Sequence, residues 1–215
     1  MDSLSQTHAL PEAEESLTPQ ALLRLDYIPP GAALAPFVTT FYHFRCDERE
    51  IRDVQPAAVG HVLVFLSGEG DMVFEGGRRD RSHRVSLLTP SSRAAPVEVD
   101  GPFHCVGAAL SPLGWAALTG LHAAEWADRL IPAEQVLGEA ITALGERMRA
   151  DYHAGTRTGA ELCQELGRFI LPLLRPVNAR HTALIRRIAE WLGTSLAPEL
   201  DDLVEGSGYS ARQLQ

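Results

Sequence analysis

The side chains best suited to chemistry lie in the stretch LVEGSGYSARQLQ, residues 203–215. Gly208 suits a tight turn, and Ser210 suits the N-cap of a following helix. An Arg guanidinium can bind guanine through O6 and N7, and a Gln amide can bind adenine through N6 and N7. The pattern therefore predicts a helix whose first turns enter a DNA major groove. The residues placed there are Ser210, Ala211, Arg212, Gln213 and Gln215.

Two helices upstream would have to position this segment. A short helix is expected from about Pro198 to Glu205, with Leu200, Leu203 and Val204 on its inner face. The helix before it should end at Gly193 and is marked by apolar residues at helical spacing: Leu184, Ile185, Ile188 and Leu192. Spacing alone fits an ordinary helical hairpin with a polar surface equally well.

Two further amphipathic helices are predicted between Pro112 and a connector around Pro176. The first has one apolar face formed by Leu137, Ile141, Leu144 and Met148. The second has a face formed by Leu162, Leu166, Phe169, Ile170 and Leu173. Pro172 should kink or end the second helix, because proline cannot donate the helical hydrogen bond. We expect the two helices to pair antiparallel, with a domain boundary near Asn178.

Short apolar or alternating runs between Phe37 and about Leu113 predict β-strands. The runs are FVTTFYHF, HVLVFL, DMVFE, HRVSLLTP, PVEVDG and HCVGAAL. The Gly-rich stretches SGEGD and EGGRRD are expected to form tight reversals between them. The expected fold class is therefore α+β: an antiparallel meander or barrel, then a helix pair, then the start of a helix-turn-helix.

Aromatic and polar residues on these strands could form a pocket for a small effector. The residues assigned to it are Phe41, His43, Arg45, His61, Phe65, Phe103 and Trp115. An alternative is that the aromatic rings are plain core. Alternation places residues 37, 39, 41, 43 and 45 on one face of a strand and residues 38, 40, 42 and 44 on the other. The pattern does not say which face points inward.

No metal, cofactor or catalytic site is expected. His43, His61, His83 and His104 stand singly on different predicted strands, without the HxH pair of metal-binding barrels. The chain has no GxSxG, HExxH, GxxxxGK[ST] or GxGxxG motif in the required context. The basic run GRRDRSHR, residues 77–84, lacks interleaved aromatic residues and is interpreted as a solvated hairpin rather than a nucleic-acid site.

Composition limits the possible partners and location. The 215 residues carry a formal net charge of -9, with a sequence pI of about 5.3. Any nucleic-acid contact must therefore come from a small part of the surface. The three cysteines are far apart, which suits a reducing compartment. No signal peptide and no apolar run long enough to span a membrane is seen, so a cytoplasmic protein without membrane contact is expected.

The segment IRRIAEWLGTSLAPELDDLVEGSGYSARQLQ, residues 185–215, resembles the start of the DNA-binding domain of AraC-type transcription regulators. The resemblance rests on the Gly-Tyr-Ser turn and the Leu-Gln pair. Val204 stands where the family usually has alanine, which adds two methyl groups at a tight helix crossing. Upstream, YIPPGAALAPFVTTFYHFR and LSPLGWAALTGLHAAEWADRLIPAEQVLG resemble the sensor region of one AraC subgroup.

This resemblance implies a domain organisation and a set of partners. The polar and acidic start of the chain predicts a disordered tail over 1–20. The resemblance implies a cupin-like sensor over 21–120, a helical dimerisation region and linker over 121–178, and an incomplete DNA-binding head over 179–215. The partners implied are DNA, a small effector and a second copy of the chain. The 215 residues are then expected to be an amino-terminal fragment of a longer regulator.

Two other functions compete with the regulator. One is a stand-alone cupin-type small-molecule binder or metal-dependent enzyme, which three convergent histidines would favour. The other is a structural dimerisation module, which a barrel filled by its own side chains would favour.

Overall fold

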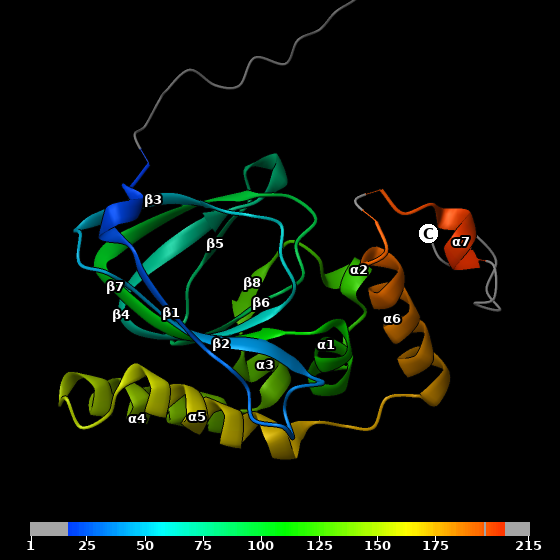
Figure 1. Cartoon of the computed structure of the whole chain (residues 1–215). Helices are drawn as coiled ribbons and strands as arrows, with labels where there is room; N and C mark the ends of the chain where they lie inside the picture. Colours follow the sequence, from blue (N-terminus) through cyan, green and yellow to red (C-terminus); the bar gives the residue numbers. More distant parts are fainter. Residues whose placement is uncertain (1–16, 196, 205–215) are drawn as a thin grey trace, which may run out of the picture.

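A computed structural model describes residues 17–195 and 197–204 and forms one eight-stranded antiparallel sheet followed by helices (Figure 1). The expected α+β class and the order of sheet and helices are confirmed. The strands are β1 (Arg24–Ile28), β2 (Val38–Cys46), β3 (Glu50–Gln55), β4 (His61–Val73), β5 (Arg79–Arg81), β6 (Val85–Leu88), β7 (Ala95–Leu110) and β8 (Leu130–Pro132).

Most of the helices follow β7, and two of them cover one face of the sheet. They are α1 (Pro112–Thr119), α2 (Ala123–Trp126), α3 (Glu134–Leu137), α4 (Ala140–His153), α5 (Gly159–Ile170), α6 (Ala179–Leu192) and α7 (Leu200–Val204). Short 3-10 turns occur at η1 (Gln20–Leu22), η2 (Glu75–Gly77) and η3 (Leu171–Leu173). In Figure 1, α4 and α5 lie along the sheet, and α6 and α7 lie at the opposite end of the molecule.

The sheet is curved but open, which corrects the expected barrel. Its strand order is β1-β2-β7-β4-β6-β8, with β3 added beside β7 and β5 beside β4. Within the described residues, the end strands β1 and β8 do not pair with each other. A barrel removes its edges by pairing its first and last strands. Here β1 and β8 remain edges, and the sheet curls without closing.

The two central strands, β4 and β7, are long and bent, where the sequence predicted several short ones. The SGEG stretch does not reverse the chain: it lies inside β4, where the register against β7 shifts twice between Phe65 and Glu69. Gly68 takes φ 74° there, a conformation that glycine adopts at little cost. Positive φ at a bulge bends a strand without ending it. The second Gly-rich stretch does reverse the chain, through η2 between β4 and β5.

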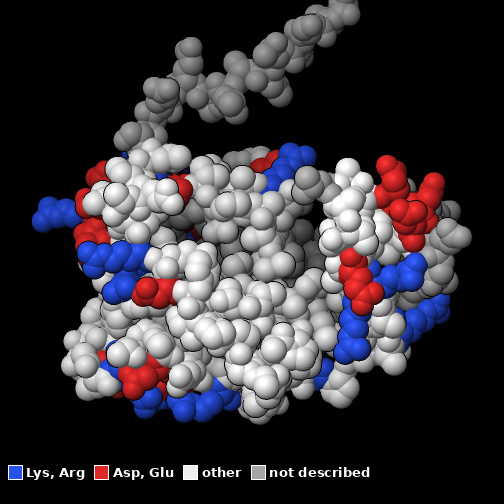
Figure 2. All heavy atoms as spheres, viewed as in Figure 1, with Lys and Arg blue, Asp and Glu red and all other residues white. Residues whose placement is uncertain are grey.

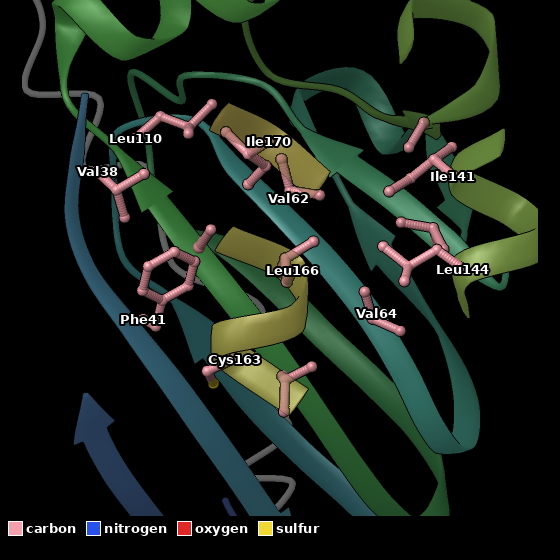
Figure 3. Close-up of a cluster of buried hydrophobic side chains, with 14 of the residues drawn as sticks. Val38, Phe41, Val62, Val64, Leu110, Ile141, Leu144, Cys163, Leu166 and Ile170 are labelled. Carbon is pink, nitrogen blue, oxygen red and sulfur yellow. The ribbon is translucent and has the colours of Figure 1, made fainter. Parts of the chain in front are cut away.

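The convex face of the sheet packs tightly against α4 and α5. Figure 3 shows Leu166 and Ile170 of α5 and Leu144 of α4 facing Val62 and Val64 of β4. All five side chains are buried. The predicted apolar faces of the two helices are therefore the faces that meet the sheet. Gly138, with φ 81°, breaks the first predicted helix into α3 and α4.

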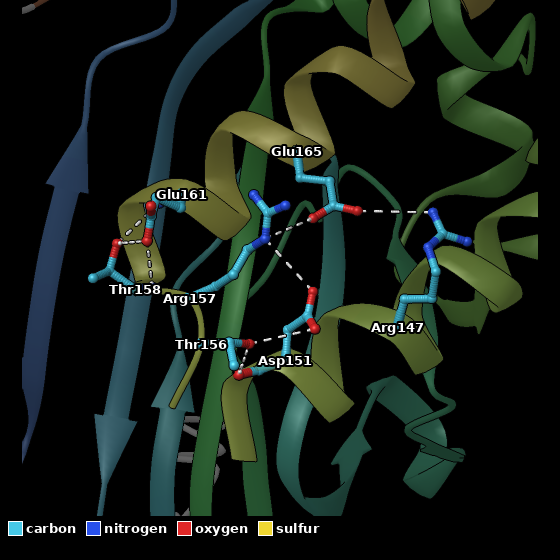
Figure 4. A network of polar contacts seen from close by, with 7 residues as sticks. All are labelled: Arg147, Asp151, Thr156, Arg157, Thr158, Glu161 and Glu165. Atoms are coloured by element: carbon cyan, nitrogen blue, oxygen red, sulfur yellow. Dashed lines mark hydrogen bonds and ion pairs between the residues drawn. The ribbon is translucent and has the colours of Figure 1, made fainter. Parts of the chain in front are cut away.

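The outer faces of α4 and α5 are joined by a polar network around their connecting loop (Figure 4). Arg157 lies between Asp151 of α4, at 3.5 Å, and Glu165 of α5, at 4.0 Å. Arg147 approaches Glu165 at 3.7 Å. Thr158 caps α5, because its hydroxyl accepts from the Glu161 amide while the Glu161 carboxylate accepts from the Thr158 amide. These contacts hold the two helices side by side.

The last described helices agree closely with the sequence. Asn178 caps α6, and its side-chain oxygen accepts from the Arg180 amide at 2.8 Å. Helix α7 packs on α6, where the Trp191 indole N–H donates to the Glu199 carbonyl at 2.8 Å. Leu203 of α7 is buried, as its place on the inner face predicted. None of the helices in the described residues is long and apolar enough to cross a membrane.

Candidate small-molecule site

The concave face of the sheet holds a cavity of about 500 Å³. Side chains from β1, β2, β3, β4, β6, β7 and β8 line it, so it follows the inside of the curl. Strand alternation explains how one sheet builds both faces. On β4, Val62 and Val64 enter the helix-facing core, while His61, Leu63 and Phe65 line the cavity.

Three of the seven residues predicted to bind an effector line this cavity: His61, Phe65 and Phe103. The ring of Phe103 lies between two others. Its centroid is 5.7 Å from that of Phe44 in an edge-to-face arrangement, and 5.5 Å from that of Phe65. Such spacings are typical of favourable aromatic pairs. The cavity therefore has an aromatic wall.

The other four predicted residues lie away from the cavity. Phe41 packs against Gly167 of α5, and His43 packs against Gly159 at the start of the same helix. Arg45 pairs with Asp26 at 2.6 Å on the same side of the sheet. Trp115 of α1 lies over Gly60, and its indole N–H donates to the Leu121 carbonyl at 3.0 Å.

The lining residues that were not predicted come from several strands, and those on β2 show why they were missed. Thr40, Tyr42 and Phe44 line the cavity, because Phe41, His43 and Arg45, which alternate with them, are on the helix-facing side. A bulge before Thr40 shifts the alternation, so Val38 also enters the helix-facing core. The alternation had separated these two sets but could not orient them. The sequence does hold one signal for which face of β2 points to the helices. Helix α5 has a small and apolar face, and such a face must pack against the sheet.

Tyr42 of β2 and His61 of β4 are in contact on the cavity wall, although β7 lies between their strands. The Tyr42 hydroxyl and Nδ1 of His61 are 2.9 Å apart, and the two rings meet edge to face. Gly107 of β7 makes the approach possible. A Cβ at Gly107 would lie 2.2 Å from Cζ of Tyr42 and 2.5 Å from its hydroxyl oxygen. The glycine therefore leaves the space in which the Tyr42 ring crosses β7 to reach His61.

Burial keeps His61, Cys105 and Tyr42 on this wall uncharged near neutral pH. It lowers the pKa of His61 to about 4 and raises that of Cys105 to about 12. It also raises the pKa of Tyr42 well above its ordinary value. Near neutral pH the pair is therefore a phenol and a neutral imidazole. Nε2 of His61 is buried and has no hydrogen-bond partner among the described residues.

The other histidines in the described part of the chain do not line the cavity. His43 and His104 lie on the helix-facing side, and each ring meets that of Tyr152 from α4 edge to face. His104 binds the Tyr152 hydroxyl through Nδ1 at 2.8 Å and Asp47 through Nε2 at 2.9 Å. Within residues 17–195 and 197–204, no group of three or more His, Cys, Asp or Glu could hold a metal ion.

The predicted DNA-reading residues Ser210, Ala211, Arg212, Gln213 and Gln215 lie outside the described residues. The helices that precede them are described. Besides the Trp191 contact, Nη2 of Arg187 donates to the Asp202 carbonyl at 3.3 Å. In Figure 2 acidic side chains gather on the α7 part of the molecule, in agreement with Asp201 and Asp202 in its first turn.

Comparisons with known proteins give a family match and one distant structural likeness. Residues 26–132, just under half of the chain, match a family described as a domain of unknown function, DUF6597. A crystal structure of the AraC-like transcriptional activator CuxR aligns with a TM-score of 0.41 and 10% sequence identity. The alignment covers 90% of this chain and 78% of that one. A similarity this low carries no argument about function. No curated protein matches the chain.

Proposed function

We propose that this chain is the sensor region of an AraC-type transcription regulator, joined to the beginning of its DNA-binding head. The concave cavity binds a small effector, and the segment from Asn178 onward starts the unit that reads DNA. The chain acts as a homodimer, as in the family that its sequence resembles. Binding of the effector changes how the two DNA-binding heads are held.

One observation carries the DNA-binding half of this proposal: α6 and α7 pack together directly ahead of the GYSARQLQ sequence. A helix-turn-helix needs a first helix fixed to its support, so that the second can enter the groove. Here the indole of Trp191 and the guanidinium of Arg187 both bind carbonyls in or next to α7. The buried Leu203 fixes the inner face of α7.

The cavity supports the sensing half. Its volume of about 500 Å³ and its largely apolar lining fall in the range typical of small-molecule sites. Its wall is made by strands whose other face carries α4 and α5. A ligand that prefers one arrangement of this sheet would bias the helices behind it, with a coupling on the order of 1–3 kcal/mol.

DNA binding by the complete reading frame tests this proposal. The 215-residue chain and the product extended past Gln215 would be compared by fluorescence anisotropy on duplex DNA at two salt concentrations. The extended protein should bind with strong salt dependence, and the 215-residue chain should bind poorly. In the extended protein, Arg212→Ala should weaken binding to the preferred sequence by about 10- to 100-fold.

A matched control separates base reading from general charge. Arg168→Ala removes the same charge from the last turn of α5 and should leave DNA binding unchanged. Equal losses from both variants would argue against base reading by Arg212.

The second candidate is a stand-alone small-molecule binder, and the cavity is the observation that favours it. The two functions share the ligand site and differ only in the role of the terminal helices. Small-molecule binding without DNA binding by the extended protein would favour the stand-alone binder.

A further inference from the structure

The cavity lining restricts the charge of its occupant. No Arg or Lys is among the residues that line it. The acidic residues that line it are Asp53 and Asp71, and Asp71 is already paired with Arg79 at 3.4 Å. A carboxylate or phosphate would lose its hydration in this cavity without gaining a cationic partner. The lining therefore disfavours an anion.

The aromatic wall restricts the shape of the occupant. Phe44, Phe65 and Phe103 form a series of edge and tilted contacts along one side of the cavity. An aromatic ligand placed against this series would extend it at the same centroid spacing, which adds to the free energy of simple area burial. Aliphatic side chains, including Leu63 and Val97, complete the apolar lining.

The Tyr42 and His61 pair supplies one directed polar contact. A phenol carries a single proton, and the partner that the structure gives for the Tyr42 hydroxyl is Nδ1 of His61. When the hydroxyl donates to Nδ1, the neutral imidazole carries its own proton on Nε2. That N–H is buried without a partner among the described residues. A buried donor without a partner is costly, so an acceptor on a bound molecule that reaches it as the lining side chains shift would satisfy it.

We propose that the cavity takes an uncharged, largely apolar aromatic molecule whose carbonyl or ether oxygen accepts a hydrogen bond from Nε2 of His61. This inference rests on the proposed function only in treating the cavity as the effector site. Tyr42 is the positioning residue, because a hydroxyl that donates to Nδ1 leaves the imidazole proton on Nε2. Gly107 allows that contact by leaving room for the Tyr42 ring.

Four naphthalene probes of similar size test the class of ligand on the 215-residue chain by isothermal titration calorimetry. They are 2-acetylnaphthalene, 2-methylnaphthalene, 2-naphthoate and 2-naphthylmethylamine. The acetyl compound should bind at least about tenfold more tightly than the naphthoate, because the anion has no partner. It should bind about three- to tenfold more tightly than the methyl compound, the amount expected for one hydrogen bond.

Two substitutions test the role of the pair. His61→Phe should reduce the affinity for 2-acetylnaphthalene to that for 2-methylnaphthalene, while the affinity for the methyl compound stays unchanged. Tyr42→Phe keeps the imidazole but frees its tautomer, so it should reduce the acetyl preference by a smaller factor. His122→Phe, the same change at an exposed position, serves as the matched control and should leave both affinities unchanged.

Each other outcome overturns the inference in a distinguishable way. Tightest binding of the naphthoate or of the amine contradicts an uncharged ligand but leaves the cavity as a sensor site. An acetyl preference that survives both substitutions contradicts the role of His61. If none of the four probes binds, the proposed class of ligand is wrong. DNA binding by the extended protein is measured separately and tests the proposed regulator function.

Discussion

The two faces of the sheet are built from alternate residues of the same strands, yet they are completed differently. The convex face is closed by α4 and α5, whose apolar side chains fill the space against Val62, Val64 and Leu66. The concave face keeps a cavity of about 500 Å³ between its own side chains. The difference indicates that the convex face provides most of the stability and that the concave face is available for binding.

The largest expected difference between the faces concerns two leucines on β4. Leu66 is fully buried in the helix-facing core, whereas Leu63 lines the cavity and is half-buried. Leu66→Ala should lower the free energy of unfolding by about 2–5 kcal/mol, because it leaves a void in a close-packed core. Leu63→Ala should cost roughly half as much or less, because its side chain already borders empty space. Urea denaturation measures both, and equal losses would contradict the contrast.

The next largest difference is expected between alanine substitutions at two glycines, one on each side of the sheet. A Cβ at Gly159 would lie 2.1 Å from Nδ1 of His43 and 2.9 Å from its Cβ, so the base of that side chain blocks it. The three atoms nearest to a Cβ at Gly107 all belong to the far end of the Tyr42 ring, which lies further from its backbone than the base of the His43 side chain does.

Gly159→Ala should therefore destabilise the fold by about 1–3 kcal/mol, although alanine is the better helix former. Gly107→Ala should cost less stability but should reduce the preference for 2-acetylnaphthalene by about as much as Tyr42→Phe does, because it moves the Tyr42 hydroxyl away from His61. Thermal denaturation and calorimetry check the two parts. A stabilising Gly159→Ala would show that α5 does not press on His43.

Acid should destabilise the protein through one histidine on each face. Burial, and then the charge of Arg45, lower the pKa of His43 to about 4, and burial lowers that of His61 to about 4. The unfolded chain takes up these protons first, near pH 6.5. The free energy of unfolding is therefore highest above pH 6.5 and falls as the pH drops toward 4.

The slope should be on the order of 1 kcal/mol per pH unit for each ring, below the full value because solvent can screen part of the charge. His43→Phe should remove more of the slope than His61→Phe, because the convex face is closed and the cavity can admit water. Urea midpoints between pH 4 and pH 7 measure it. A slope unchanged by both substitutions would assign acid sensitivity to other groups.

The smallest expected effect belongs to the cap of α5 on the convex face. Thr158→Ala removes the hydroxyl that accepts from the Glu161 amide at 3.3 Å and should lower stability by about 1 kcal/mol. Thr158→Ser keeps the hydroxyl and serves as the control. Ligand binding in the cavity should be the same in both variants, and a loss of binding with the alanine variant would mean that the two faces are coupled through α5.

The sequence predicted α4 to α7 because their signals are local, whereas α1 and α2 were not predicted from it. The apolar spacing of Ile141, Leu144 and Met148 and the stop at Pro172 depend only on neighbours in the chain. The faces of the strands could not be assigned, because alternation on β2 separates Phe41 and His43 from Tyr42 and Phe44 without saying where the helices pack. That choice depends on contacts between segments more than one hundred residues apart.

The bend of β4 could not be predicted from the sequence either. A glycine with positive φ, such as Gly68, is found both in chain reversals and in β-bulges. The pairing of β4 with β7 determines that Gly68 lies in a bulge. The same bend carries Gly70, Asp71 and Met72 to the cavity wall. Of the seven residues that the sequence assigned to an aromatic pocket, only His61, Phe65 and Phe103 line the cavity.

Methyl-labelled NMR spectra of the 215-residue chain, recorded with and without 2-acetylnaphthalene, test the assignment of the two faces most directly. The methyl signals of Leu63, Val97 and Val99, which line the cavity, should shift as the probe is added. Those of Val62, Val64 and Leu66, on the same sheet but facing the helices, should stay in place. Shifts confined to the second set, or no shifts in either set, would contradict a binding site on the concave face.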